Sequence, residues 1–189
     1  GSDLYLASLP SLPQAFGTTP AHAQLTLTLF MLAFGFAQLV AGPVADRVGR
    51  MPVLRFGIVT YALASGVAIV ATDIGTLLVL RVAQGAGAAC GVVAGRALIR
   101  DRFETVTAAP LVADIFALTA VVSVIAPVLG GYLEAATGHR GSFAVMTVFG
   151  LAVLVLLWFG PAVPPRTAAT LHPKALLEGA RLVWRDRAF

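Results

Sequence analysis

Five long apolar runs constrain this chain more than any other feature of its sequence. They cover residues 25–44, 53–71, 77–99, 111–133 and 142–159. Each has about 20 residues, the length that a helix rising ~1.5 Å per residue needs to cross a ~30 Å hydrocarbon core. A single run could be a buried helix of a soluble protein. Five in succession predict an all-α membrane protein.

The composition supports this interpretation. Hydrophobic residues make up 58% of the 189 residues and charged residues only 12%, against ~25% in soluble domains. Cys90 is the one cysteine, which excludes a disulfide framework and a cysteine-rich metal site. The three histidines fall in separate loops, so we expect no enzyme, no metal site and no cofactor.

The two ends of the chain differ from the runs between them. Residues 4–16 are apolar but too short to span, and we interpret residues 3–16 as part of an incomplete first helix. We assign residues 1–160 to a transmembrane bundle and residues 161–189 to a linker. A proline-rich break opens the linker, and a basic stretch with an apolar stripe follows, which predicts an amphipathic helix on a membrane surface. A flexible linker is the alternative.

The basic residues predict the orientation. If the helices alternate, 11 of the 13 Lys and Arg residues lie on one side, Arg140 lies on the other, and Arg81 lies within a span. Cytoplasmic loops carry such an excess. We therefore expect the linker in the cytoplasm of a multi-pass protein of the bacterial inner membrane. Topology then explains the basic pI, and a nucleic-acid partner is unnecessary.

Charged residues inside spans are costly and are candidates for function. Asp3 is expected near mid-membrane, where a carboxylate is a candidate for binding and releasing a proton. An ordinary solvated residue at the end of the chain is the alternative for Asp3. Arg81 is expected ~10 Å deep, and Asp114 lies one turn from the cytoplasmic end of its helix, where we expect a structural role.

Arg81 has candidate partners in the first segment. Pro10 and Pro13 lack N–H groups, which frees the carbonyls of Leu6 and Leu9 at a similar depth. We hypothesise that Arg81 bonds these carbonyls and so senses the state of Asp3. Snorkelling of Arg81 to the outer surface is the alternative.

Small residues predict close helix packing. Gly87, Gly91 and Gly95 repeat every four residues on one face, where a neighbouring helix can approach. In residues 111–133, Pro127 predicts a kink and the glycines after it predict close packing. Glycines in mid-span do not fit a dinucleotide-binding loop, which needs a preceding strand.

Several motifs resemble the major facilitator superfamily. GPVADRVGRMPVL (42–54) resembles its loop between helices 2 and 3, RVAQGAGAACG (81–91) its helix-4 motif, and APVLGG (126–131) its antiporter helix. DLYLASLP (3–10), TTPAHAQLTLTLFMLAFG (18–35) and GRALIRD (95–101) resemble the drug:proton antiporter branch of bicyclomycin, chloramphenicol and florfenicol exporters, the Bcr/CflA group.

The resemblance implies roles for individual residues. It implies proton coupling for Asp3 and Arg81. It implies an antiporter helix with Ala126, Pro127, Gly130 and Gly131. It implies a cytoplasmic gate motif made by Gly42, Asp46, Arg47, Gly49, Arg50 and Asp101. Met51 replaces a usual second base of the loop motif, which weakens the gate's charge network.

The resemblance also implies an architecture and a function. The family has twelve helices in two six-helix halves, so we expect this chain to be the N-terminal half, with the C-terminal bundle absent and no transport by the chain alone. The expected function is proton-coupled export of amphipathic drugs through a cavity. Candidate cavity residues are Tyr5, Gln24, Phe30, Gln38 and Gln84, of which Tyr5 and Phe30 could instead serve packing.

The partners implied are a small drug or metabolite, the proton, the lipid bilayer and the missing half. Two alternatives stay open. One is a metabolite or amino-acid exporter on the same fold, and the other is a membrane interaction subunit that does not transport.

Overall fold

A computed structural model describes residues 2–102 and 105–159, with the side chains of residues 2–3, 102 and 105–109 left out of that description. The described residues form helices and turns with no strand. The helices are α1 (Ser2–Leu6), α2 (Leu12–Ala15), α3 (Pro20–Val48), α4 (Arg50–Ile69), α5 (Ile74–Arg102), α6 (Thr105–Thr137) and α7 (His139–Phe159). The linker predicted at 161–189 lies outside the described residues.

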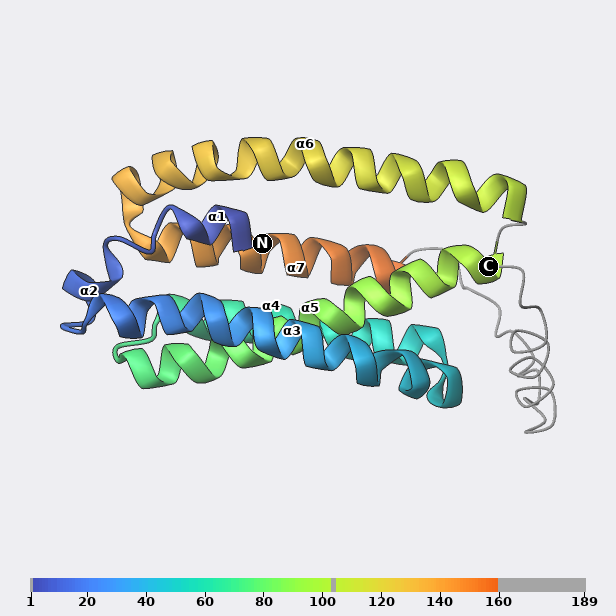
Figure 1. Cartoon of the computed structure of the whole chain (residues 1–189), viewed down its shortest axis with the longest axis horizontal. Coiled ribbons are helices and arrows are strands. Elements are labelled where there is room, and N and C mark those ends of the chain that lie inside the picture. Colours follow the sequence, from blue (N-terminus) through green and yellow to red (C-terminus); the bar gives the residue numbers. More distant parts are fainter. Residues whose placement is uncertain (1, 103–104, 160–189) are drawn as a thin grey trace, which may run out of the picture.

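The helices α3 to α7 are long and apolar enough to cross a membrane. They run side by side along the long axis of the molecule (Figure 1). Many of their large apolar side chains point outward, such as Leu39, Trp158 and Phe159, which are 74%, 74% and 82% exposed. An outward apolar surface of this kind suits a lipid solvent, and the expected all-α membrane fold is confirmed.

The helices extend beyond the apolar runs, because capping residues outside the runs set where each helix begins and ends. Thr19 accepts a hydrogen bond from the His22 amide at the start of α3, where Pro20 takes the first helical position. Gly49 ends α3 with a φ of 104°, a conformation that favours glycine. At the start of α5, hydrogen bonds from Thr76 to Asp73 lower the pKa of that carboxyl below its ordinary value.

The first segment is broken rather than one helix over 3–16. Residues 7–11 form turns between α1 and α2, with Pro10 inside the break. The Leu6 carbonyl accepts a hydrogen bond from the Leu9 amide at 3.3 Å. A tight turn therefore supplies a partner for the carbonyl that Pro10 cannot serve.

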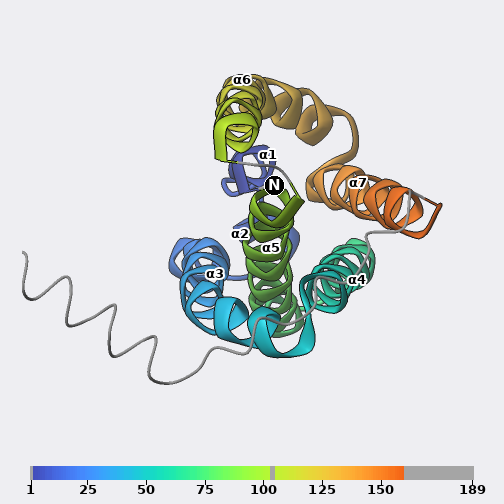
Figure 2. The same ribbon diagram turned by 90° about the vertical axis from the view of Figure 1, so that its right-hand side faces the viewer.

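Helix α5 lies between α3 and α4 in the end-on view of Figure 2. In the same view α1 lies above α5, α6 lies at the top, and α7 lies at the right between α6 and α4. Glycines permit the closest approaches. A Cβ on Gly57 would lie 2.6 Å from the Gly87 carbonyl oxygen, and one on Gly87 would lie 2.6 Å from the Gly57 oxygen. A Cβ on Gly85 would meet the Phe30 backbone, whereas one on Gly95 meets open space. The predicted glycine face is thus close-packed only in part.

The residues of the APVLGG motif (126–131) on α6 divide between a buried face and an exposed face of the helix. Ala126 and Gly130 are buried, and a Cβ on Gly130 would collide with the Leu4 backbone of α1. Pro127 is exposed, and a Cβ on Gly131 would meet nothing within 4 Å. Close packing of α6 therefore depends on the Ala126 face, and α1 is what packs there.

Candidate functional site

Arg81 is a buried cation in the middle of the bundle. It lies on α5, and only 1% of its surface is exposed. Its Nη1 donates to Oε1 of Gln84 at 2.8 Å, and its Nε donates to the Thr26 carbonyl oxygen of α3 at 3.4 Å. Two hydrogen bonds therefore hold the guanidinium against its own helix and against α3.

The polar network continues into α4. Gln84 is fully buried, and its Nε2 donates to the Ser65 hydroxyl at 2.8 Å. The Ser65 hydroxyl donates in turn to the Tyr61 carbonyl oxygen at 2.7 Å. Since Gln84 uses both ends of its amide, it links Arg81 to α4 and leaves no buried amide atom without a partner.

Two aromatic rings hold the guanidinium of Arg81 as well. Its Cζ lies 4.1 Å from the ring centre of Tyr5 and 4.4 Å from that of Phe30. Such cation–π contacts are worth up to ~2 kcal/mol when they are desolvated. The Tyr5 and Thr26 hydroxyls are hydrogen bonded at 2.6 Å. The Tyr5 ring is the contact between Arg81 and α1.

One donor of Arg81 stays unsatisfied. Its Nη2 is buried and has no hydrogen-bond partner, and no described carboxylate forms an ion pair with Arg81. A buried charge normally requires pairing and full hydrogen bonding. We define the Arg81 cluster as Tyr5, Thr26, Phe30, Arg81 and Gln84. In this cluster Nη2 of Arg81 can therefore donate to an anionic or carbonyl group that binds there.

The predicted bonds to the first-segment carbonyls are wrong. Arg81 donates to Thr26 and Gln84, and the Leu6 carbonyl accepts from the Leu9 amide. The Leu6 carbonyl therefore finds its partner within the turn at Pro10 and does not bond Arg81. Arg81 is also too buried to snorkel. The aromatic face of Tyr5, rather than the backbone, carries the contact with α1.

The structure brings together three of the five predicted cavity residues. Tyr5, Phe30 and Gln84 surround Arg81, whereas Gln24 is exposed and Gln38 is half-buried further along α3. A shallow hollow of about 350 Å³ lies elsewhere, on α6, lined by Pro127, Val128, Gly131, Tyr132 and Ala135. The five cavity candidates do not share one described cavity.

The other two charges predicted within spans do not join the Arg81 cluster in the described structure. Asp114 is exposed, and the side chain of Asp3 lies outside the description.

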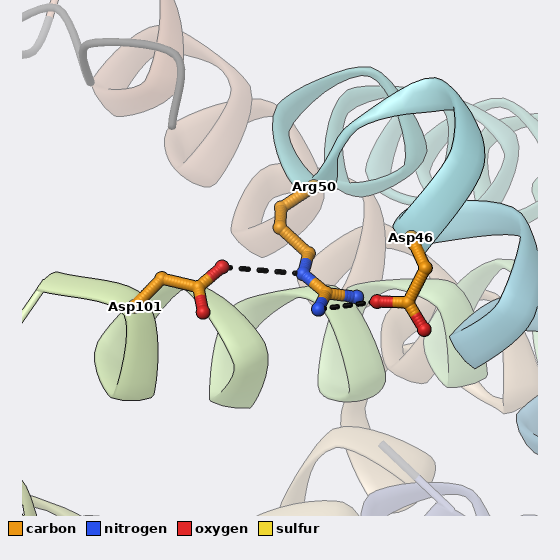
Figure 3. Close-up of polar contacts among 3 residues, drawn as sticks. All are labelled: Asp46, Arg50 and Asp101. Carbon is orange, nitrogen blue, oxygen red and sulfur yellow. Dashed lines mark hydrogen bonds and ion pairs between the residues drawn. The ribbon is translucent and has the colours of Figure 1, made fainter. Parts of the chain in front are cut away.

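A second charged group lies where α3 meets α4. Arg50 forms an ion pair with Asp46 one turn earlier, and its Nε lies 3.3 Å from Oδ2 of Asp101 on α5 (Figure 3). We call these three residues the Arg50 cluster. Of the other residues in this motif, Arg47 is exposed, Gly49 forms the turn, and a Cβ on Gly42 would meet nothing within 4 Å. The expected ion pairs thus join the ends of three helices.

Sequence reasoning did not single out three residues of this network. Thr26, Tyr61 and Ser65 support Arg81 and Gln84 directly or through one hydrogen bond. The available signal was spacing, since Thr26 and Phe30, like Tyr61 and Ser65, lie four residues apart and so share one helix face.

Comparison with known proteins assigns the family. Residues 1–189 match the family described as Major Facilitator Superfamily. The chain belongs to the Major Facilitator Superfamily, a family of transporters rather than enzymes, and it is a multi-pass membrane protein.

The relatives carry drug-resistance names. The chain is 33% identical over 179 residues to the chloramphenicol resistance protein of Pseudomonas aeruginosa, covering 94% of this chain and 43% of that protein. It is 31% identical over 159 residues to a bicyclomycin resistance protein homolog of Haemophilus influenzae, covering 84% and 40%. It is also 31% identical over 159 residues to the multidrug resistance protein MdtL of Escherichia coli O81, covering 84% and 41%.

These names agree with the drug:proton antiporter branch that the motifs resemble. The chain spans less than half the length of each of these relatives, as expected of one half of a two-bundle transporter.

Proposed function

We propose that this chain is half of an exporter that moves small amphipathic drugs out across the bacterial inner membrane by alternating access, in exchange for protons. Chloramphenicol, florfenicol and bicyclomycin represent the class of substrate. One observation carries the proposal beyond the names of the relatives. Arg81 is buried with an unsatisfied donor, and its guanidinium lies against the Tyr5 ring of α1. A buried ionisable group in a membrane bundle is otherwise an expensive feature without a benefit.

Proton coupling uses Asp3 and Arg81 together. Asp3 lies on α1, two residues before Tyr5, whose ring stacks on Arg81. An ionised Asp3 on that short helix attracts the guanidinium and holds α1 against α5, whereas protonation removes the attraction. In this mechanism, α1 is the element whose position depends on the proton, and substrate binds when that position changes.

In the orientation that we propose, the Arg50 cluster lies at the cytoplasmic surface. Arg47, Arg50, Arg55 and Arg100 lie at one end of the bundle, while Arg140 lies at the other. The excess of basic residues marks the cytoplasmic side. The linker at 161–189 then starts in the cytoplasm, and the turns before α3, α5 and α7 face outward.

Drug susceptibility tests the proposal. Cells that express the complete gene are expected to tolerate more chloramphenicol, florfenicol or bicyclomycin than cells with an empty vector. Asp3→Asn, which cannot ionise, is expected to return tolerance to the vector level because the proton site is lost. Resistance in the Asp3→Asn variant equal to the parent would contradict proton coupling at Asp3. Tolerance unchanged by the complete gene for every drug would favour a metabolite exporter or a non-transporting subunit.

The Arg50 cluster gives a second prediction. Its side chains are partly exposed, so each ion pair contributes only about 0–1 kcal/mol to stability. We expect Arg50→Ala to change the unfolding temperature little but to slow efflux several-fold, because the three helix ends lose their connection at the gate. The matched control is Arg100→Ala, since Arg100 lies outside the gate motif, is exposed and makes no ion pair among the described residues. Equal efflux by both variants would remove the gate role.

A further inference from the structure

The hydroxyl groups of the Arg81 cluster donate to partners within the bundle. The Thr26 hydroxyl donates to the Ala23 carbonyl oxygen at 2.5 Å, so in its 2.6 Å contact with the Tyr5 hydroxyl it can only accept. Tyr5 is therefore the donor in that contact. Since both protons are used, neither hydroxyl has a proton left to donate to a ligand.

The amide of Gln84 is engaged in the same way. Its Oε1 accepts from Nη1 of Arg81, and its Nε2 donates to the Ser65 hydroxyl. Nε of Arg81 donates to the Thr26 carbonyl oxygen. Within the described part of the cluster, Nη2 of Arg81 is thus the one buried donor group without a partner, and it carries two N–H bonds.

The surroundings of Arg81 restrict what can bind at Nη2. The Tyr5 and Phe30 rings contact the guanidinium, and both side chains are buried. The half-buried Phe34 stacks on Phe30 with ring centres 6.2 Å apart, which extends the aromatic surface along α3. A flat apolar group that ends in an oxygen acceptor suits these surroundings, because its ring can pack against aromatic side chains while its oxygen accepts from Nη2.

We propose that Nη2 of Arg81 binds an oxygen acceptor at the end of an aryl ring of the exported drug. The inference rests on the proposed function, which supplies the class of drug. Chloramphenicol carries a nitro group at the para position of its ring and florfenicol carries a methylsulfonyl group there, so both present two acceptor oxygens at the same place. Because Arg81 is 1% exposed, the drug reaches Nη2 only when a neighbouring element such as α1 moves.

Binding of two related compounds tests the site. Equilibrium binding to the purified transporter from the complete gene is measured for chloramphenicol and for an analogue with chlorine in place of the nitro group. We expect the parent to bind chloramphenicol about tenfold or more tightly than the analogue, which leaves Nη2 without an acceptor. Arg81→Met keeps an unbranched side chain but has no donor, and it is expected to bind the two compounds with similar affinity.

The ratio of the two affinities separates a binding role of Arg81 from a merely structural one. The matched control is Arg55→Met, since Arg55 is exposed and also contacts an aromatic ring. It is expected to keep the parental ratio. If Arg81→Met weakens the binding of both compounds equally and so keeps the parental ratio, Arg81 only supports the bundle and the proposal is overturned. Equal affinities in the parent, or no binding of chloramphenicol by the parent, would also overturn it.

The infrared spectrum of the bound drug gives a second readout that requires no variant. The nitro stretching bands of chloramphenicol are assigned with ¹⁵N-labelled drug, and a hydrogen bond from Nη2 is expected to shift them from their position in an apolar solvent. Unshifted bands in the parent would overturn the site even if Arg81→Met does not fold. Neither readout requires transport, so shifted bands without any drug-driven proton movement would support the site while the efflux proposal fails.

Discussion

Replacing Arg81 with Ala is expected to reduce drug efflux to the level of cells without the transporter, with the protein still inserted in the membrane. The substitution removes the hydrogen bonds to Thr26 and Gln84 and the cation between two rings. Hydrogen bonds to charged groups contribute about 1.5–3 kcal/mol each, but removing the unsatisfied Nη2 offsets part of that loss. Arg81→Lys is expected to fail too, because an ammonium group lacks the planar fork that stacks and bonds in two directions.

The control for this experiment is Arg55→Ala. Arg55 also contacts an aromatic ring, that of Trp158 at 5.7 Å, but it is exposed. We expect Arg55→Ala to transport at close to the parental rate. Efflux assays on membranes with matched protein levels give the comparison. Parental efflux by Arg81→Ala, or equal losses in both variants, would show that the buried cation has no special part in transport.

A methyl group on Gly87 is expected to destabilise the bundle strongly. It would lie 2.6 Å from the Gly57 carbonyl oxygen and 2.8 Å from the Tyr61 amide nitrogen, both of which are backbone atoms that cannot rotate away. Overpacking of a core costs about 1–3 kcal/mol, and here α4 and α5 must separate to relieve it. We expect Gly87→Ala to lower the unfolding temperature of the purified protein and its level in the membrane.

Gly95→Ala is the matched control for Gly87→Ala. Gly95 lies two turns further along α5, and its added Cβ would meet nothing within 4 Å. Alanine also favours a helix over glycine by up to ~1 kcal/mol, so Gly95→Ala is expected to be neutral or slightly stabilising. Similar unfolding temperatures for the two variants would mean that α4 and α5 do not approach as closely as the structure places them.

The sequence was sufficient to predict the five membrane-capable helices of the described residues, but not where these helices end. Runs of apolar residues report the part of a helix within the hydrocarbon core. Polar caps such as Thr19 and turn glycines such as Gly49 set the ends, and α3 consequently extends beyond 25–44. The break in residues 3–16 was harder to predict, because Pro10 and Pro13 are compatible with either a kink or a turn.

The sequence indicated individual residues of the candidate site but not the contacts that they make. Arg81 stands out because a charge in a span is rare, and Gln84 stands out one turn later. The partner of Arg81 on α1 depends on how that short helix is placed, and this placement depends on Gly130 of α6, which admits the Leu4 backbone. Such a dependence between segments far apart in sequence leaves no local sequence pattern. We therefore predicted the Leu6 and Leu9 carbonyls as the partners of Arg81 in the first segment, whereas the structure has the Tyr5 ring there.

Proton movement during transport tests the central proposal most directly. The transporter from the complete gene is reconstituted in liposomes with a pH-sensitive dye inside, and chloramphenicol is added in the absence of any imposed pH gradient. Proton-coupled exchange predicts that the drug gradient drives a pH change inside the liposomes, which Asp3→Asn and Arg81→Ala abolish and Arg55→Ala preserves. Chloramphenicol transport with no pH change, or an equal pH change in Asp3→Asn, would contradict the proposal.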